Sequence, residues 1–197
     1  MPITRELIVQ SLVMVCVVAV LLAVVADFLL FDQRTEIWQG QNSIVRTSTM
    51  VGFYLVYYLV IRFSVWTVSV ASPTWNTVLD SVGLLLMFIG AITNISGRLW
   101  LKQNWGNNIR IYTDHTLVRN GPFRFVRHPL YASLVWMFTG GALVYRSPIA
   151  LLMNGLIFAP FMTYRARQEE KLLRLTFPEY DTYQKQTGMF FPKIGRR

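Results

Sequence analysis

The residues best suited to chemistry in this chain lie in one short basic segment, residues 121–131 (GPFRFVRHPLY), which holds one of only two histidines. The His128-Pro129 pair predicts a helix start, because a proline in the first helical turn gives up a backbone N–H that would be unpaired anyway. His128 would then lie beside unpaired N–H groups that favour anionic atoms such as a carboxylate. A plain helix cap with basic neighbours touching lipid phosphates is the alternative interpretation.

A second candidate cluster is residues 165–170 (RARQEE), at the end of the last apolar run. Arg165 and Glu169 are spaced i, i+4 and share one helix face, and Glu170 points about a quarter-turn away. Two carboxylates near a membrane interface cost free energy unless a cation compensates them, and a sulfonium, an ammonium or an arginine would do so. The alternative is an ordinary surface salt bridge, worth less than about 1 kcal/mol.

The composition shows what kind of scaffold must position these clusters. Of 197 residues, 53% are hydrophobic and only 15% are charged, whereas soluble domains carry roughly 25% charged residues. Mean hydropathy is +0.39, and the apolar residues fall in long blocks. The chain is therefore predicted to be an all-α, polytopic membrane protein. Its net charge of +9 is better explained by loops that contact anionic lipids than by nucleic-acid binding.

About five transmembrane helices are expected within a single domain, residues 1–197. Three form the N-terminal part, residues 1–95. A polar loop, a helical hairpin and a C-terminal segment follow in residues 96–197, and Pro160 is expected to kink the second arm of the hairpin. Because no small-residue cleavage site follows the first apolar run, that run is expected to be retained. The expected spans are residues 7–30, 49–71, 78–95, 130–145 and 148–164.

The basic residues are distributed asymmetrically across this topology. Sixteen of the nineteen Lys and Arg residues fall on one side, mostly in the loop 96–127 and in the tail from residue 165 onward. This bias predicts that the loop and the C-terminus both face the cytoplasm. Arg62 is expected within a span, where an ionisable group suggests function; snorkelling or pairing with Asp80 or Asp27 explains it equally well.

Several classes of site are disfavoured by the residue inventory. Two histidines and the single Cys16 fall short of a metal-ligand set, so no metal is expected, and Cys16 is expected to be a packing residue. The chain has no glycine-rich phosphate loop followed by Lys-Ser/Thr. The aromatic residues of the third loop are too few for a nucleic-acid-binding surface.

The two clusters together resemble the core of the isoprenylcysteine carboxyl methyltransferases and related phospholipid methyltransferases. The similarity covers residues 104–192 and includes HTLV at 115–118, GPFR at 121–124, RHPLY at 127–131, the Glu169-Glu170 pair and FPEYDTY at 177–183. Two positions depart from the family's pattern. Phe123 replaces the commoner Tyr, which removes a hydroxyl, and Pro178 replaces the commoner Gly in the C-terminal segment.

This resemblance implies S-adenosylmethionine as methyl donor, held in a cytosolic pocket beneath the C-terminal segment, and a lipophilic substrate that enters from the bilayer. By position in the motifs, Arg165 would lie near the reacting group of the substrate. The family's cofactor contacts map onto Asn108, His115, Leu117, Val118, Phe123, His128, Pro129, Leu130, Tyr131, Glu169 and Glu170.

The acceptor implied most directly is a lipophilic carboxylate, since Arg165 is placed to anchor one. Phospholipid amines and thiols are alternatives, and so is a non-catalytic protein that binds lipid. Apart from membrane lipids and the substrate, no nucleic acid or metal is expected as a partner. A prokaryotic inner membrane is the expected location.

Overall fold

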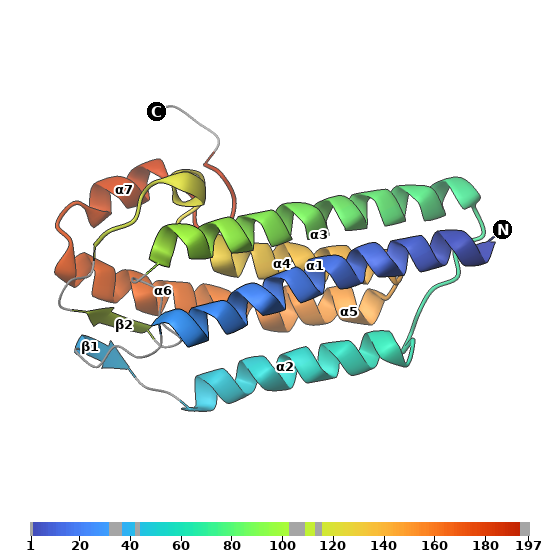
Figure 1. Cartoon of the computed structure of the whole chain (residues 1–197), viewed down its shortest axis with the longest axis horizontal. Coiled ribbons are helices and arrows are strands. Elements are labelled where there is room, and N and C mark those ends of the chain that lie inside the picture. Colours follow the sequence, from blue (N-terminus) through green and yellow to red (C-terminus); the bar gives the residue numbers. More distant parts are fainter. Residues whose placement is uncertain (1, 32–36, 42–43, 103–108, 113–115, 194–197) are drawn as a thin grey trace.

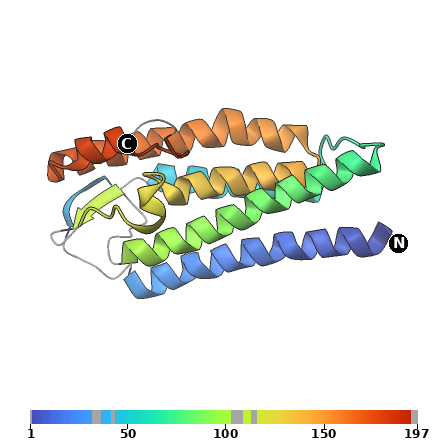
Figure 2. The ribbon, with the colours of Figure 1, turned by 90° about the horizontal axis from the view of Figure 1, so that it is seen from above.

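The computed structural model describes residues 2–31, 37–41, 44–102, 109–112 and 116–193. Its helices lie side by side as an elongated bundle (Figures 1 and 2). The N-terminus, the loop before α3 and the turn after α4 lie at one end of the bundle. The strands, α7 and the C-terminus lie at the other (Figure 1).

Three helices are long and apolar enough to cross a membrane. They are the Arg5–Asp27 part of α1 (Pro2–Phe31), α3 (Pro73–Leu101), and the continuous helix Pro148–Thr176, which comprises α5 (Pro148–Met153), η3 (Asn154–Phe158) and α6 (Ala159–Thr176). The apolar parts of α2 (Ile44–Arg62) and α4 (Pro129–Val144) are shorter. The helical membrane fold is thus confirmed, while the number of five crossings stays a prediction.

The boundaries of α2 and α3 differ from those expected from hydropathy. The second span was expected to reach residue 71, but α2 ends at Arg62, and Ser64 and Trp66 adopt positive φ angles of 52°. The chain re-enters a helix where Ser72 accepts a hydrogen bond from the Trp75 N–H and Pro73 occupies the first turn. Helix α3 then runs on to Leu101, so its last residues are not part of the loop predicted from residue 96.

The last long helix contains a π-helical turn, η3. Pro160 has no N–H to donate to the preceding turn, and Ala159 N–H bonds back to Asn154 O, five residues earlier. The Asn154 amide donates to Val135 O (3.0 Å) and Thr139 Oγ1 (2.8 Å), which ties this turn to α4. Pro160, which was predicted to kink the second arm of the hairpin, therefore follows a π-helical turn that is hydrogen-bonded to α4.

The polar end of the bundle is built from short elements. Strands β1 (Ile37–Gln41) and β2 (Ile109–Tyr112) pair antiparallel, with Gly40 opposite Arg110. This small sheet was not predicted by the analysis of the sequence. A 3₁₀ turn, η2 (Gly121–Arg124), precedes α4, and α7 (Tyr180–Gln186) follows α6 after a turn at Pro178. The described parts of the loop and the tail that were expected to face one compartment thus meet at one end of the bundle (Figure 1).

Glycines allow α3 and α4 to pack closely. A Cβ added at Gly140 would lie 2.5 Å from Gly83 O, and one added at Gly83 would lie 2.7 Å from Gly140 O. Gly90 is equally crowded, since its added Cβ would lie 2.5 Å from Met137 Cγ. Small residues of this kind let helix backbones approach each other in a membrane, where no hydrophobic force drives helices together.

Two buried aspartates, Asp27 and Asp80, form ion pairs that join helices at the two ends of the bundle. Arg98 donates to Asp27 (2.5 Å) and joins α3 to α1. At the other end, Asp80 accepts from both Arg5 (2.7 Å) and Arg146 (2.8 Å). Arg62 was expected in mid-span but is the last residue of α2 and is exposed. Its suggested partners, Asp27 and Asp80, are instead paired with these three arginines.

Replacing Gly140 with alanine should weaken the α3–α4 contact. The added methyl group overlaps the Gly83 carbonyl, so we expect a loss of about 1–3 kcal/mol in the free energy of unfolding. Gly52→Ala is the matched control, because an added Cβ there meets nothing within 4 Å and alanine favours a helix by about 0.5–1 kcal/mol over glycine. Unfolding in mixed detergent micelles measures both. Equal stability of the two variants would contradict the close contact.

Candidate active site

The segment before α4 is shaped by a short turn and by contacts from the C-terminal region. Gly121 adopts a φ of +59°, Pro122 starts η2, and the Phe123 ring is buried. The Tyr183 hydroxyl donates to the Phe123 carbonyl (2.5 Å), so α7 holds this turn in place. Phe123 thus contributes a carbonyl to the packing of α7, a role that needs no side-chain hydroxyl.

The residues just before α4 run beside the C-terminal segment. Val126 forms a parallel bridge with Gly188, and the Arg127 N–H donates to Gly188 O (2.8 Å). The His128 N–H donates to Met189 O (3.2 Å). These backbone bonds place the Arg127 and His128 side chains between α6 and the C-terminal segment.

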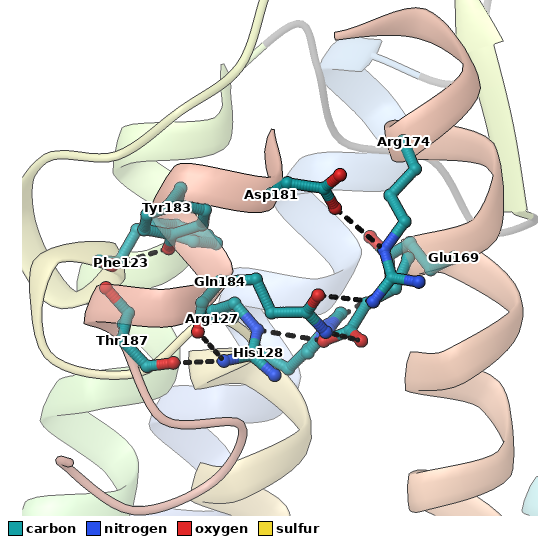
Figure 3. A network of polar contacts seen from close by, with 10 residues as sticks. Phe123, Arg127, His128, Glu169, Arg174, Asp181, Tyr183, Gln184 and Thr187 are labelled. Atoms are coloured by element: carbon teal, nitrogen blue, oxygen red, sulfur yellow. Dashed lines mark hydrogen bonds and ion pairs between the residues drawn. The ribbon is translucent and has the colours of Figure 1, made fainter. Parts of the chain in front are cut away.

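Glu170 is the centre of this region (Figure 3). Its carboxylate accepts from Arg127 Nε (2.9 Å) and Gln184 Nε2 (2.9 Å), and it lies 3.1 Å from His128 Nε2. The residue is only 4% exposed. A buried carboxylate needs this number of donors, because each lost hydrogen bond leaves charge without solvation.

Arg127 extends the same network into α7. Beyond Glu170, its guanidinium donates to the carbonyl oxygens of Gln184 (3.2 Å) and Thr187. Arg174 on α6 also contacts Gln184 and forms an ion pair with Asp181 (3.3 Å). Figure 3 shows these contacts joining α6, α7 and the start of α4. The alternative interpretation had the basic neighbours of His128 touching lipid phosphates, but Arg127 is an interior residue of this network.

His128 lies between the two neighbouring carboxylates. Its Nδ1 is 3.4 Å from Glu169 Oε2, and its ring stacks on Tyr131 with centroids 5.6 Å apart. Burial alone would lower the pKa of His128, but the hydrogen bonds and charges of Glu169 and Glu170 outweigh it. The pKa is raised above its ordinary value of 6.5. The charged, imidazolium form of His128 is thereby favoured beside the two carboxylates.

Glu169 is the more accessible of the two carboxylates, with its side chain 37% exposed against 5% for Glu170. Tyr131 lies between Glu169 and Arg165 and interacts with both. The Arg165 guanidinium lies 5.8 Å from the Tyr131 ring centre and donates to the Met50 sulfur (2.9 Å). The alternative interpretation was an ordinary surface salt bridge, but Arg165 is buried and both residues interact with Tyr131.

The two predicted clusters come together in this site. Phe123, His128, Tyr131, Arg165 and both glutamates lie around one network, and Pro129 starts α4 as expected. Leu130 faces another neighbour: an added Cβ at Gly97 of α3 would lie 3.1 Å from its side chain. Leu117 and Val118 are half-buried in the extended stretch before η2. Asn108 and His115 lie outside the described residues.

Some members of the network were not predicted from the sequence. Gln184 and Thr187 carried no signal in the sequence, because they act through an amide and a backbone carbonyl. Tyr180 and Tyr183 belong to the motif at residues 177–183, which marked the segment without assigning it a contact. No group of three or more His, Cys, Asp or Glu placed to hold a metal occurs among the residues that the structure describes.

Comparisons with known proteins place this arrangement in a family. The model of the isoprenylcysteine carboxyl methyltransferase family matches residues 81–175. A nickel-cobalt-cadmium resistance protein of Alcaligenes xylosoxydans xylosoxydans is 30% identical over 171 residues, which is 86% of this chain and 69% of that protein. A cobalt-zinc-cadmium resistance protein of Cupriavidus metallidurans is 27% identical over 71% of this chain and 63% of its own length.

An enzyme and a solved structure are also similar to this chain. The protein-S-isoprenylcysteine O-methyltransferase of Saccharomyces cerevisiae is 28% identical over 57% of this chain, but the match spans only 48% of that enzyme. The structure of a eukaryotic intramembrane Ras methyltransferase, an isoprenylcysteine carboxyl methyltransferase, matches with a TM-score of 0.56 at 22% identity. That match covers 78% of this chain and 55% of the other, and it supports the fold.

Breaking the Arg127–Glu170 contact should detach the C-terminal segment. In Arg127→Gln the buried Glu170 loses its strongest donor, so we expect a loss of roughly 3–5 kcal/mol in stability. Hydrogen exchange should rise in residues 177–193. Arg124→Gln is the control, since Arg124 is a nearby exposed arginine. Unchanged exchange in Arg127→Gln would show that this contact does not hold the segment.

The stability of the protein should depend on pH through the titration of His128. The pKa of His128 is raised in the folded state. Its contribution to stability is therefore complete at a pH below its ordinary pKa of 6.5, and this contribution is lost as the pH rises through the pKa of the folded protein. Thermal unfolding followed across this range should therefore show decreasing stability in His115→Gln, where His128 is the remaining histidine. The double variant His115→Gln/His128→Gln should lack this slope; an identical slope would contradict the assignment.

Proposed function

The chain belongs to the isoprenylcysteine carboxyl methyltransferase family, and from that membership we propose that it transfers a methyl group from S-adenosylmethionine to a lipophilic carboxylate. The observation that carries this proposal is the meeting of residues 121–131 and 165–170 around His128. This site lies at one end of a bundle of apolar helices, where a water-soluble donor and a lipid-soluble acceptor can both approach.

The residues present fit the proposed cofactor. Glu169 offers a partly exposed carboxylate, oriented by His128 and Tyr131, which suits an ammonium group or ribose hydroxyls. Two buried polar atoms, Trp136 Nε1 and the Tyr180 hydroxyl, have no hydrogen-bond partner among the described residues. Buried groups of this kind normally have partners, and their presence is consistent with a polar ligand.

The two glutamates differ in how free they are to bind a ligand. The Glu170 carboxylate is already used by Arg127, His128 and Gln184, so we assign it to positioning His128 and the C-terminal segment. Glu169 is then the carboxylate that contacts the cofactor. The other proposed contacts rest on the family motifs alone and are Asn108, His115, Leu117, Val118, Phe123, His128, Pro129, Leu130 and Tyr131.

When bound, S-adenosylmethionine supplies a methyl group on a cationic sulfur that is open to displacement. The residues of this chain have little proton transfer to perform, because an acceptor carboxylate is already ionised at neutral pH. Arg165 is placed to hold such a carboxylate by a charge-assisted, bidentate contact. Its role is to align the acceptor oxygen, since bringing reactants into line supplies much of the rate of such a reaction.

The positive charge of Arg165 favours a carboxylate acceptor over an amine or a thiol. An amine acceptor that carries positive charge would be repelled by the guanidinium, whereas a carboxylate is attracted. A thiol would first need to lose its proton. Arg165 is 7% exposed and lies beside the polarisable Met50 sulfur and the Tyr131 ring.

The orientation in the membrane belongs to the same proposal. We place the active end and the C-terminus in the cytoplasm, because most Lys and Arg residues belong to the loop 96–127 and to the tail from residue 165 onward. A prokaryotic inner membrane would give the site direct access to S-adenosylmethionine, which is made in the cytosol.

The first test of this function is cofactor binding. We expect the purified protein to bind S-adenosylmethionine in calorimetry and Glu169→Gln to weaken binding about 10–100-fold, since hydrogen bonds to a charged group contribute about 1.5–3 kcal/mol. Glu179→Gln is the control, because Glu179 is exposed at the start of α7. Absence of binding in the unaltered protein would support the non-catalytic alternative; equal affinity in Glu169→Gln would refute the cofactor contact.

A further inference from the structure

A series of hydrogen-bonded polar side chains crosses the interior of the bundle from α1 to α4. Arg98 on α3 forms an ion pair with Asp27 on α1, and its Nε donates to Asn94 Oδ1 (2.8 Å). The Asn94 amide donates to Ser133 Oγ (2.8 Å), and the Ser133 hydroxyl donates to Leu130 O (2.7 Å). Asn94 and Ser133 are 0% exposed. We refer to Asp27, Arg98, Asn94 and Ser133 as the polar bridge.

The hydrogen bonds of the polar bridge have a fixed direction. A guanidinium can only donate, so the carbonyl oxygen of Asn94 must face Arg98 and its NH₂ group must face Ser133. The Ser133 hydroxyl then donates to the backbone of α4. Leaving a polar group without a partner among membrane helices costs free energy, so turning one member of the bridge would disrupt the others.

The polar bridge meets α4 at the turn that carries part of the candidate site. Leu130 and Ser133 flank Tyr131, whose ring stacks on that of His128. The His128 carbonyl accepts from the Ala132 N–H (2.9 Å), so His128 is joined to the same helical turn. A hold on this turn is therefore a hold on both rings.

The packing of α3 on either side of Asn94 keeps the two helices close. An added Cβ at Gly97 would lie 3.1 Å from the Leu130 side chain, and one at Gly90 would lie 2.5 Å from Met137 Cγ. Such contacts limit how near the backbones come, but van der Waals contact has no preferred direction. Hydrogen bonds do have one, so the bonds from Asn94 fix how α4 is placed along and around its own axis.

The His128 ring needs this placement because its other contacts come from separate elements. Glu169 and Glu170 on α6 lie 3.4 Å and 3.1 Å from its two nitrogens. Phe190 of the C-terminal segment meets the ring edge-on, with centroids 6.5 Å apart. A small shift of the first turn of α4 would lengthen the contacts to both carboxylates.

We propose that Asn94 is a positioning residue, which holds the first turn of α4 so that His128 and Tyr131 meet Glu169. The rest of the polar bridge orients Asn94 for this role. Because Asn94 is fully buried, it acts through α4 rather than on a ligand. The effect on the cofactor rests on the proposed function, whereas the effect on His128 follows from the geometry alone.

The bundle contains a matched control for this arrangement. Asn154 is 2% exposed, and its amide donates to Thr139 Oγ1 (2.8 Å), whose hydroxyl donates to Val135 O (2.9 Å). The pattern repeats that of Asn94 and Ser133 but lies beyond the first turn of α4. Its loss should lower stability in a similar way without moving that turn.

The test follows the titration of His128 by nitrogen-15 NMR of the full chain in detergent. His115→Gln is present in every variant, so that one histidine remains. We expect Asn94→Leu and Ser133→Ala to bring the pKa of His128 down from its raised value toward 6.5, because the contacts to the two carboxylates lengthen.

A second measurement, calorimetry with S-adenosylmethionine, uses proteins that keep His115. Affinity should fall about tenfold in Asn94→Leu and in Ser133→Ala, as expected when a hydrogen bond to a charged group is weakened. The control variants Asn154→Leu and Thr139→Val should change neither the affinity nor the titration of the remaining histidine.

An unchanged titration of His128 in Asn94→Leu and Ser133→Ala overturns the inference. An equal change in Asn154→Leu and Thr139→Val also overturns it, since that result would show a general loosening of the bundle. Ser133→Ala decides the matter by itself if Asn94→Leu does not fold. Absence of S-adenosylmethionine binding in the unaltered protein refutes the proposed function, and the titration still decides the role of Asn94.

Discussion

The arrangement of the active end depends on one buried carboxylate, that of Glu170. Moving a carboxylate from water into a protein interior costs several kcal/mol even after relaxation. Here the cost is offset by donors from three separate parts of the chain: Arg127 before α4, Gln184 on α7, and His128. Since none of these donors can leave without exposing the charge, the start of α4, α6 and the C-terminal segment are held in one relative position.

Because of this constraint, the two adjacent glutamates have different orientations and different surroundings. Successive residues of a helix point about 100° apart, which follows from 3.6 residues per turn. When Glu170 turns inward to its donors, Glu169 must turn toward the edge of the site. There its carboxylate meets the other nitrogen of His128 while its side chain remains 37% exposed. A single imidazole thus orients both carboxylates, and the one left accessible is suited to bind a ligand.

How much of the fold and of the candidate site could be predicted from the sequence depends on the kind of interaction. The hydropathy pattern predicted the long helices. The residue types of the two clusters left alternatives open, and the charge asymmetry together with the family resemblance joined His128, Glu169 and Arg165 into one expected site; the binding roles of these residues stay predictions. The end of α2 at Arg62 and the pairing of Asp27 with Arg98 were not predictable, since they depend on partners brought close only by the fold. Gln184 was missed for the same reason: a neutral amide has no distinctive sequence pattern until its partner, Glu170, is known.

The separation of charge in the site bears on how it would catalyse methyl transfer. Transfer from a sulfonium to a carboxylate converts a cation and an anion into two neutral products, so charge diminishes toward the transition state. With the proposed roles, Glu169 beside the donor and Arg165 beside the acceptor would stabilise the bound reactants more than the transition state, and this alone would lower the rate. The benefit must come from alignment. Tyr131 interacts with both Glu169 and Arg165, so one side chain at the start of α4 helps to fix the position of both charged groups.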